Sequence, residues 1–248
     1  MQKISVTIIT LNEEKNIEKC IASVKKFADE IVIVDSGSSD KTCDIAKRLG
    51  AKVFFRKFDD YSTQKNFAVS KSKNEWIFSI DADEVATEEL AEEVKIVVKV
   101  KDINGYLIPR KNIIFGAEIK HTRFSPDKHI WLWRKDKGKW IGKVHEEVFV
   151  DGWTSELKGA KIHYQYETVS DFWNMINDYT DRIADEMVSQ NRKFSYFMLF
   201  FAPLFSFLRR FFYKKGYLDG WRGFVLSYLM AIYRMTTWIK VWERELRW

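Results

Sequence analysis

The sequence has 248 residues, 46% of them hydrophobic, which is enough for one α/β domain with an appendage. The formal net charge of +6 is unevenly distributed, because the stretch from Arg192 to the end holds 11 Lys and Arg against 3 Asp and Glu, leaving the first 191 residues slightly acidic. A basic tail on an acidic body argues against a nucleic-acid-binding protein.

The first hundred residues alternate between strand and helix patterns. Apolar and β-branched runs predict strands at 4–9, 31–34, 53–55 and 76–80. Helical spacing predicts helices between them, the first covering 17–24 with Asn12 as its N-cap and the second ending at Gly50. This order predicts a mostly parallel sheet flanked by helices.

The residues before and after the first predicted strand exclude several classes of protein. Met1 leads directly into the strand pattern, which predicts no signal peptide. The loop after the strand lacks the glycines of a dinucleotide-binding or P-loop motif. Cys20 and Cys43 have no metal-ligand spacing, so we expect reduced thiols in a cytosolic protein.

The predicted strand ends at 35 and 80 carry acids. Asp35 follows the second strand and could accept hydrogen bonds from a base or a ribose hydroxyl, while Asp40 is expected to cap the next helix. Asp81 and Asp83 follow the fourth strand two positions apart, so both carboxylates could face one divalent cation with its phosphate ligands. The alternative is a helix start, in which Glu84 and Thr87 serve only as N-terminal caps.

Four segments together carry a resemblance to a known family. They are Ser5 to Glu14, Asp35 to Thr42, Gln64-Lys65-Asn66-Phe67-Ala68 and Asp81-Ala82-Asp83-Glu84. In this order and spacing they resemble family 2 glycosyltransferases of the GT-A fold. Trp131 to Lys135 and Val144 to Val148 extend the similarity to β-1,4-glucosyltransferases of bacterial lipopolysaccharide core assembly.

The resemblance implies roles for individual residues. The nucleoside of a nucleotide-sugar would be held by Thr10, Leu11, Glu13 and Asp35. Lys65 would lie near the nucleotide, Asp81 would hold the ribose or the water shell of a metal, and Asp83 would ligate that Mg²⁺ or Mn²⁺. Relatives are expected to have an arginine where this chain has Trp131, so a phosphate contact there would depend on Arg134.

The segment 103–166 reads as short antiparallel strands added to the predicted sheet, at 106–108, 113–115, 130–133 and 148–150. An inverting transfer needs a general base, which we assign to Glu146 with Glu147 as the alternative, because neighbouring strand residues face opposite sides. His145 is expected to orient Glu146 or to contact the acceptor. His163 could be a third metal ligand or a core histidine.

A helix predicted at 169–190 carries an apolar stripe that should pack on the sheet. The tail beyond it has 15 uncharged residues from Phe194 to Leu208, too few to cross a bilayer unaided. Aromatic residues between Lys and Arg favour helices lying in an anionic membrane interface, whereas a packed helical hairpin or a homodimer interface is the alternative.

We therefore expect a GT-A domain at 1–190 and a helical membrane-interface region at 191–248. The predicted activity is an inverting, metal-dependent transfer of a sugar from a nucleotide-sugar, with a UDP-hexose expected, to a lipid-linked glycan at the cytoplasmic face of the inner membrane. Alternatives are transfer to polyprenyl phosphate and a non-catalytic nucleotide-binding membrane scaffold. The expected partners include no nucleic acid, and a homo-oligomer is possible.

Overall fold

The computed structural model describes residues 2–142 and 146–246, and its chain divides into two compact units. Unit 1 consists of residues 1–111 and 127–163, and unit 2 consists of residues 112–126 and 164–248. This division differs from the expected boundary at residue 190, since the segment 112–126, with the end of β6 (Gly105–Ile114) and β7 (Ala117–Ile119), and the helix from residue 169 both belong with the tail. Each unit has its own hydrophobic cluster.

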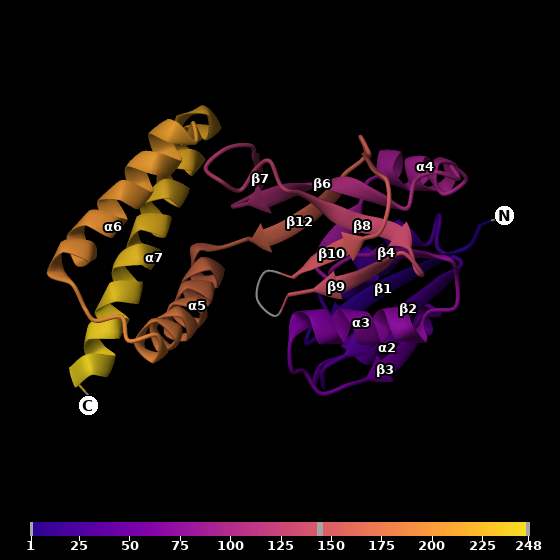
Figure 1. The fold of residues 1–248 in the computed structure, drawn as a ribbon, viewed down its shortest axis with the longest axis horizontal. Helices are drawn as coiled ribbons and strands as arrows, with labels where there is room; N and C mark the ends of the chain where they lie inside the picture. Colours follow the sequence, from indigo (N-terminus) through magenta and orange to yellow (C-terminus); the bar gives the residue numbers. More distant parts are fainter. Residues whose placement is uncertain (1, 143–145, 247–248) are drawn as a thin grey trace. The chain divides into compact units, whose positions relative to one another are not determined.

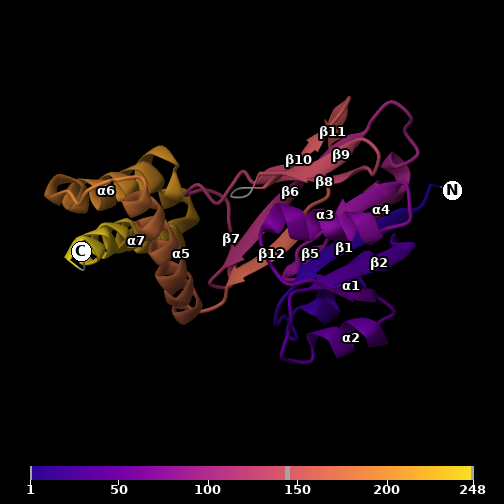
Figure 2. The ribbon, with the colours of Figure 1, turned by 60° about the horizontal axis from the view of Figure 1, so that its bottom comes forward.

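Unit 1 opens with the expected alternation of strands and helices. Its parts in order are β1 (Ile4–Thr10), α1 (Ile17–Val24), β2 (Glu30–Asp35), α2 (Thr42–Arg48), β3 (Lys52–Phe55), α3 (Tyr61–Lys71) and β4 (Trp76–Ser79). β1 pairs in parallel with both β2 and β4, and β2 pairs in parallel with β3. α3 lies on one face of these strands, and α1 and α2 lie on the other (Figures 1 and 2).

The antiparallel half of the sheet follows. Its elements are β5 (Glu84–Ala86), α4 (Glu88–Val97), β6 (Gly105–Ile114), β8 (Lys128–Arg134), β11 (Thr154–Glu156) and β12 (Lys161–Tyr166). The strand order is β3-β2-β1-β4-β8-β6-β12-β5, with β11 also paired to β6. The expected strands at 106–108 and 113–115 are both contained in the single strand β6, which continues through Pro109.

The strand at 148–150 was expected in the main sheet, and this expectation is wrong. β10 (Glu147–Val150) pairs only with β9 (Gly138–Ile141) in a separate two-stranded ribbon. Trp140 of this ribbon is buried and meets Trp131 and Trp133 of β8 edge to face, at centroid distances of 5.6 Å and 5.8 Å. The ribbon is therefore anchored to unit 1 by aromatic packing.

Of the helix caps considered at 12, 40 and 87, one is observed. Thr87 caps α4 through the N–H of Leu90. Asp40 accepts from the N–H of Thr42 at 3.0 Å, but the N-cap position of α2 is occupied by Lys41, so Asp40 is not the N-cap. Asn12 does not cap α1, which begins after Asn16. Asn12 has a φ of 56° and its Oδ1 accepts from the backbone N–H of Ser39, so it connects two loops.

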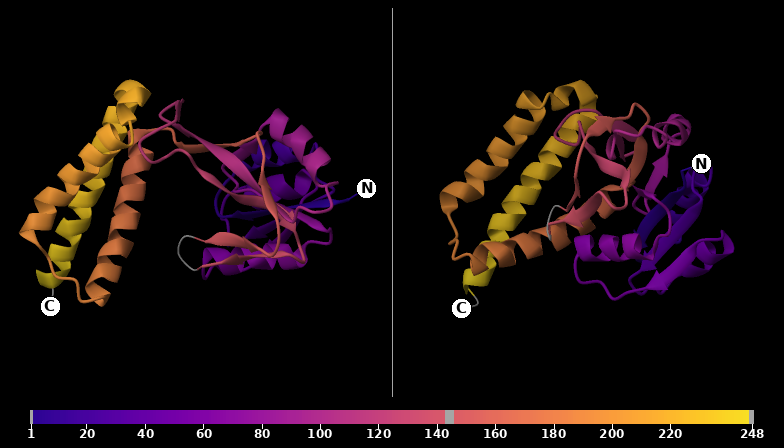
Figure 3. Two further views of the ribbon diagram at one scale, coloured as in Figure 1. Left: turned by 45° about the horizontal axis from the view of Figure 1, so that its top comes forward. Right: turned by 45° about the vertical axis from the view of Figure 1, so that its right-hand side comes forward.

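Unit 2 is mainly helical (Figure 3). It contains β7 (Ala117–Ile119), α5 (Val169–Ser189), α6 (Tyr196–Leu208), a π-helical turn (Arg209–Tyr213), a 3₁₀ turn (Gly216–Asp219) and α7 (Gly220–Leu246). α6 and α7 form an antiparallel hairpin, and α5 packs on α7. The apolar stripe of α5 is therefore explained by packing within unit 2, where Phe172 and Ile176 join Leu226 and Leu229 in one cluster.

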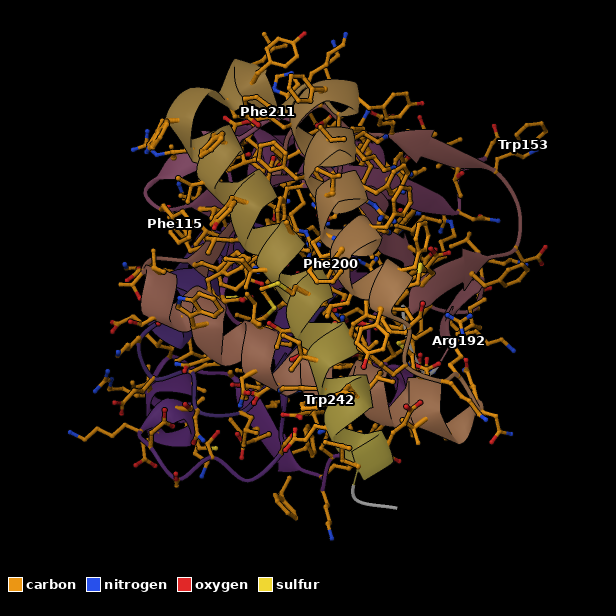
Figure 4. The ribbon with its side chains drawn as sticks, turned by 90° about the vertical axis from the view of Figure 1, so that its left-hand side faces the viewer. Phe115, Trp153, Arg192, Phe200, Phe211 and Trp242 are labelled. Carbon is orange, nitrogen blue, oxygen red and sulfur yellow. The ribbon has the colours of Figure 1, made fainter. Side chains whose placement is uncertain are left out.

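Helix α6 has no fully buried residue and exposes large aromatic side chains. Phe200, labelled in Figure 4 on the face turned toward the viewer, is 74% exposed. Among the described residues, no helix has both the length and the apolar character that a bilayer crossing requires.

Candidate functional site

The carboxyl ends of β1, β2 and β4 meet at one edge of the sheet in unit 1. Thr10 is the partner of Asp35 in the β1–β2 register, and the backbone of Ile80, just beyond β4, donates to the carbonyl of Thr7. Three of the predicted site segments therefore share this edge, which is where ligands bind in open α/β sheets. The predicted convergence of Thr10, Asp35 and Asp81 follows from the parallel pairing.

The loop after β1 offers polar groups to this edge. The Oγ1 of Thr10 is buried without a hydrogen-bond partner among the described residues, and Leu11 beyond it is 51% exposed. Burial raises the pKa of Glu13, the Asn16 amide opposes that shift, and the nearby charges of Asp83 and Asp40 add to it. This loop thus holds an unused hydroxyl and a carboxylate that would gain from a hydrogen-bond donor.

Asp35 is buried and organises its own loop. Its Oδ1 accepts from the N–H groups of Gly37 (2.9 Å) and Ser38 (2.8 Å), and its Oδ2 accepts from the Ser38 hydroxyl. The sequence interpretation missed this turn, which is a common local use of Asp. Gly37 has a φ of 108°, a conformation that favours glycine.

Lys65 on α3 is the centre of the site. Its Nζ lies 3.2 Å from Asp81 Oδ1 and 3.1 Å from Glu146 Oε1, and it sits 4.4 Å from the ring centroid of Trp140. Burial lowers the pKa of Lys65, but the charges of Asp81 and Glu146 outweigh that effect and raise it. The ammonium therefore stays protonated at neutral pH and holds two carboxylates from distant parts of the chain together.

Asp81 stays ionised although it lies at the edge of the hydrophobic core. Burial favours its neutral form, but the charges of Lys65, Lys161 and Arg110 hold its pKa well below the usual range. Its side chain retains 29% of its exposure, so one face stays open to a ligand. Its backbone N–H donates to Glu84 Oε2 at 3.0 Å.

A buried ion pair lies directly beneath these acids. Lys161 Nζ donates to Glu84 Oε2, both side chains are fully buried, and Arg110 Nη1 approaches the other oxygen of Glu84 at 3.4 Å. The Lys161 ammonium also lies 3.1 Å from the ring centroid of Trp131. Glu84 is therefore no helix cap, and the expectation of a capping role for it is wrong.

Asp83 pairs with a histidine that the sequence left ambiguous. The Nε2 of His163 lies 3.0 Å from Asp83 Oδ2, and although burial lowers the pKa of His163, this hydrogen bond raises it. Within the described residues, no three His, Cys, Asp or Glu side chains are gathered closely enough to hold a metal ion by themselves. Carboxylate oxygens and an imidazole nitrogen are nonetheless a donor set that suits Mn²⁺ and, through the oxygens, Mg²⁺.

Of the three candidates for acid–base chemistry, the structure describes two, and it places them differently. Glu146 reaches Lys65 and is 20% exposed at its side chain. Glu147 begins β10 and is exposed, with its backbone opposite Ile141. His145 lies outside the described residues. The arrangement brings Glu146 to Asp81 through their shared partner Lys65 and leaves Glu147 out.

The expected phosphate contact of Arg134 is wrong. Arg134 is opposite Trp76 in the β4–β8 register, at the start of β4, whereas the acids follow the end of that strand. Its guanidinium pairs with Glu75 and lies 4.7 Å from the ring centroid of Trp76. β8 runs antiparallel, as expected for the strand at 130–133, and its pairing with β4 places Trp131, not Arg134, at the acidic edge.

Sequence reasoning missed Lys161 and Arg110. A usable signal was present, because Lys161 and His163 are two apart in a strand and therefore share one face. Both side chains meet acids of the Asp81–Glu84 segment.

Comparisons with known proteins agree with this geometry. The model of glycosyl transferase family 2 matches residues 5–151. The chain is 34% identical to an uncharacterized glycosyltransferase of Rickettsia typhi, over 100% of this chain and 89% of that protein. It is 29% identical to the lipopolysaccharide core biosynthesis glycosyltransferase LpsC of Rhizobium meliloti, over 98% of this chain and 93% of that protein.

Among solved structures, the chain resembles residues 1–349 of S. aureus TarS in complex with UDP. The TM-score is 0.52 at 17% identity, and the match covers 93% of this chain and 90% of that chain. At this identity the likeness concerns the fold, and it confirms the α/β arrangement expected from the sequence.

Proposed function

Because the chain belongs to glycosyl transferase family 2, we propose that it transfers a hexose from a UDP-sugar to a lipid-linked glycan of the lipopolysaccharide core type. The observation that carries the proposal is the bridge from Lys65 to Asp81 and Glu146 at the carboxyl edge of β4. UDP is chosen because it is the ligand of the TarS complex. The acceptor class follows the lipopolysaccharide core relative.

The donor would lie along the loops after β1 and β2. The unpartnered hydroxyl of Thr10 and the carboxylate of Glu13 would gain hydrogen bonds from the nucleoside. Asp35 would act mainly by fixing the 35–38 turn, since its oxygens already accept from Gly37 and Ser38. Because this turn is already ordered, ligand binding does not carry the entropy cost of ordering it.

Glu146 would serve as the general base. It would remove the proton of the acceptor hydroxyl as that oxygen attacks the anomeric carbon, and the nucleoside diphosphate would leave from the opposite face, inverting the configuration. Lys65 orients this carboxylate through a contact of 3.1 Å, and Trp140 beside Lys65 keeps water away. A base held by an ion pair on a buried lysine stays in position between turnovers.

A divalent cation fits the acids of this edge. Asp83 would bind it directly, His163 is placed to add its Nε2, and Asp81 would contribute through its exposed oxygen or through water. When bound, the ion would offset the charge of the leaving diphosphate.

We also propose that unit 2 attaches to the membrane surface at the cytoplasmic face. Its helix α6 exposes Phe200 and other large aromatic side chains, with Arg209 and Arg210 at one end. Aromatic and basic residues together suit the interface of an anionic bilayer.

The decisive experiment is nucleotide binding by calorimetry, followed by a donor screen. We expect UDP to bind in the presence of Mn²⁺ or Mg²⁺ and this binding to be lost when a chelator is added. Asp83→Ala should abolish binding. The control Glu92→Ala removes an exposed acid on α4 and should leave binding unchanged. Metal-independent UDP binding, or unchanged binding by Asp83→Ala, would remove the metal assignment. Transfer of hexose to a soluble alcohol but never to a glycolipid would contradict the acceptor class.

A further inference from the structure

Unit 2 contains a cavity of about 430 Å³ whose walls are cationic and aromatic. Its basic lining comes from four segments of the unit, and these residues are Arg123, Arg192, Arg209, Arg210, Lys214 and Arg234. Among the described residues that line it there is no Asp or Glu. The apolar lining comes mostly from α6, including Phe197, Phe201 and Phe205.

The cations of the cavity are not neutralised from within the described chain. None of the six forms an ion pair with a carboxylate there, whereas Arg244, on the same helix as Arg234, pairs with Asp181 and Asp185. Burial, together with the charges of Arg123, Arg234 and Arg209, lowers the pKa of Arg210 to about 10. Cations gathered in this way repel one another, and an external anion would relieve the repulsion.

Arg210 is held in place by the surrounding chain, whereas the other five cations of the cavity have exposed side chains. Arg210 Nη1 donates to the carbonyl of Thr122 at 2.8 Å, and its guanidinium lies 5.6 Å from the ring centroid of Phe124. Asp219 holds the same loop through the N–H of His121 at 2.9 Å. Thr122 and Arg123 have φ values of 62° and 85°, so strained backbone presents Arg123 to the cavity.

A cluster of cations without acidic partners in the described chain, next to an apolar wall, is complementary to an anionic amphiphile. Arginine offers paired N–H groups that match phosphate oxygens, and aromatic side chains accommodate acyl chains. The aromatic wall is continuous with the exposed face of α6, where Phe197 is also exposed. A soluble phosphate alone would leave this apolar wall without a role.

We propose that the cavity of unit 2 is a binding site for the phosphomonoester head group of an anionic lipid. The site shares no residue with the nucleotide site, since all of its lining residues belong to unit 2. The inference extends the proposed function, whose acceptor is lipid-linked, but its test measures lipid binding and requires no transfer activity. Failure of the lipid-binding test therefore leaves the proposed transfer function untouched, and failure of the transfer function leaves the lipid-binding proposal untouched.

The test compares the full chain on two kinds of phosphatidylcholine vesicle with equal surface charge, one containing phosphatidic acid and the other phosphatidylglycerol. Phosphatidic acid has a phosphomonoester and phosphatidylglycerol a diester. We expect about tenfold tighter binding to phosphatidic acid, the scale of one or two added charge-assisted hydrogen bonds. Equal binding to both vesicles would overturn the proposal.

The cavity variant combines Arg123→Gln, Arg209→Gln and Arg234→Gln. It should lose the preference for phosphatidic acid while keeping a residual attachment through α6. Because the three side chains disfavour the charge of Arg210, the melting temperature of this variant should equal or exceed that of the wild type. A lower melting temperature would show that the arginines stabilise the fold and would contradict an anion site.

A matched control removes three exposed cations of unit 2 that do not line the cavity, Lys120→Gln, Arg182→Gln and Lys193→Gln. The control should retain the preference for phosphatidic acid. An equal loss of this preference in the control and in the cavity variant would mean that vesicle binding depends only on the overall positive charge of the unit, which would contradict the proposal.

A second variant, which combines Arg123→Lys, Arg209→Lys and Arg234→Lys, keeps the charge but not the planar guanidinium group, so it should bind vesicles yet lose the preference for phosphatidic acid. Inorganic phosphate is the last arm. If it saturates the cavity while no vesicle preference exists, the lipid assignment is wrong.

Discussion

The two units handle their charges in opposite ways. In unit 1, Lys65 is shared by Asp81 and Glu146, and Lys161 is shared between Glu84 and the ring of Trp131. In unit 2, the six cations of the cavity have no carboxylate partner in the described chain. The first arrangement is complete without a ligand and serves to hold side chains in position. The second arrangement is incomplete and needs an anion from outside.

This difference separates a site built for chemistry from a surface built for attachment. Catalytic carboxylates must be held in one geometry, so an internal counter-charge is useful. Cations that recruit an anionic ligand lose affinity for it when an internal acid already occupies them. The experiments below break or sharpen this contrast, beginning with the largest expected effect.

The first prediction is that breaking the buried pair of unit 1 is costly. Lys161→Met should lower the free energy of unfolding by about 3 kcal/mol, because the buried Glu84 keeps only the Arg110 guanidinium at 3.4 Å and the backbone N–H of Asp81 at 3.0 Å as partners. Urea unfolding measures the loss. The control Lys158→Met removes an exposed lysine three residues earlier and should change stability little. Equal stability of the two variants would mean that Glu84 does not depend on Lys161.

The second prediction concerns the carboxylate held by Lys65. Glu146→Gln should reduce kcat by roughly 10²- to 10⁴-fold, the usual scale for losing a general base, with little change in the KM for the donor. Glu147→Gln is the matched neighbour and should retain most activity, since its side chain is exposed on β10. The reverse result would assign the base to Glu147.

The third prediction uses a cation that is paired but lies away from the site. Arg134→Gln should leave the donor KM within about twofold of the wild-type value, because its register partner is Trp76 at the start of β4. The pair with Glu75 is partly exposed, so its loss should cost no more than about 1 kcal/mol. A large rise in the donor KM would restore the phosphate role that the structure argues against.

The smallest expected effect is a change in acid sensitivity. Glu30 accepts from Lys52 Nζ (2.6 Å) and the Ser5 hydroxyl (2.7 Å). Burial alone would raise its pKa, yet these bonds and one from the backbone of Lys73 lower it below the ordinary value of 4.5. A carboxylate with a lowered pKa adds stability above its unfolded pKa, and that contribution is lost as the pH falls.

Glu30→Gln should therefore flatten the loss of stability below about pH 4.5, as measured by urea midpoints across that range. Glu89→Gln, an exposed acid on α4, serves as the control. Parallel pH profiles for Glu30→Gln and the wild type would contradict the prediction.

Periodicity and strand-end acids were sufficient to predict the parallel half of unit 1. The β-branched runs of β1 and β2 and the single apolar face of α1 leave few alternatives, and parallel pairing then brings Thr10, Asp35 and Asp81 to one edge. Lys65 and Glu146 were also predicted for the site, although the ion pairs that Lys65 makes with Asp81 and Glu146 were not.

The antiparallel half was predicted only in part, because its pairings are non-local. Antiparallel strands at 106–108 and 130–133 were expected, but the partner of each strand was not. Whether Trp131 or Arg134 reaches the acidic edge depends on the pairing of β8 with β4, and whether 148–150 joins the main sheet depends on Trp140 packing against β8. Local patterns carry neither piece of information. The role of Glu84 was mistaken for the same reason, since its partner Lys161 is distant in sequence.

The two-part origin of unit 2 has a consequence for its modularity. The chain enters the unit once at 112–126 and again at 164, so its hydrophobic cluster joins Ile114 and Ile119 from the first visit to Leu226 and Leu229 from the second. Truncation at residue 190 would remove the α7 residues from that cluster and leave its other apolar side chains without packing partners. We expect the independently folding catalytic fragment to be one in which a short turn replaces 112–126 and the chain stops at 163. Transfer of unit 2 to another enzyme would likewise have to include the 112–126 segment.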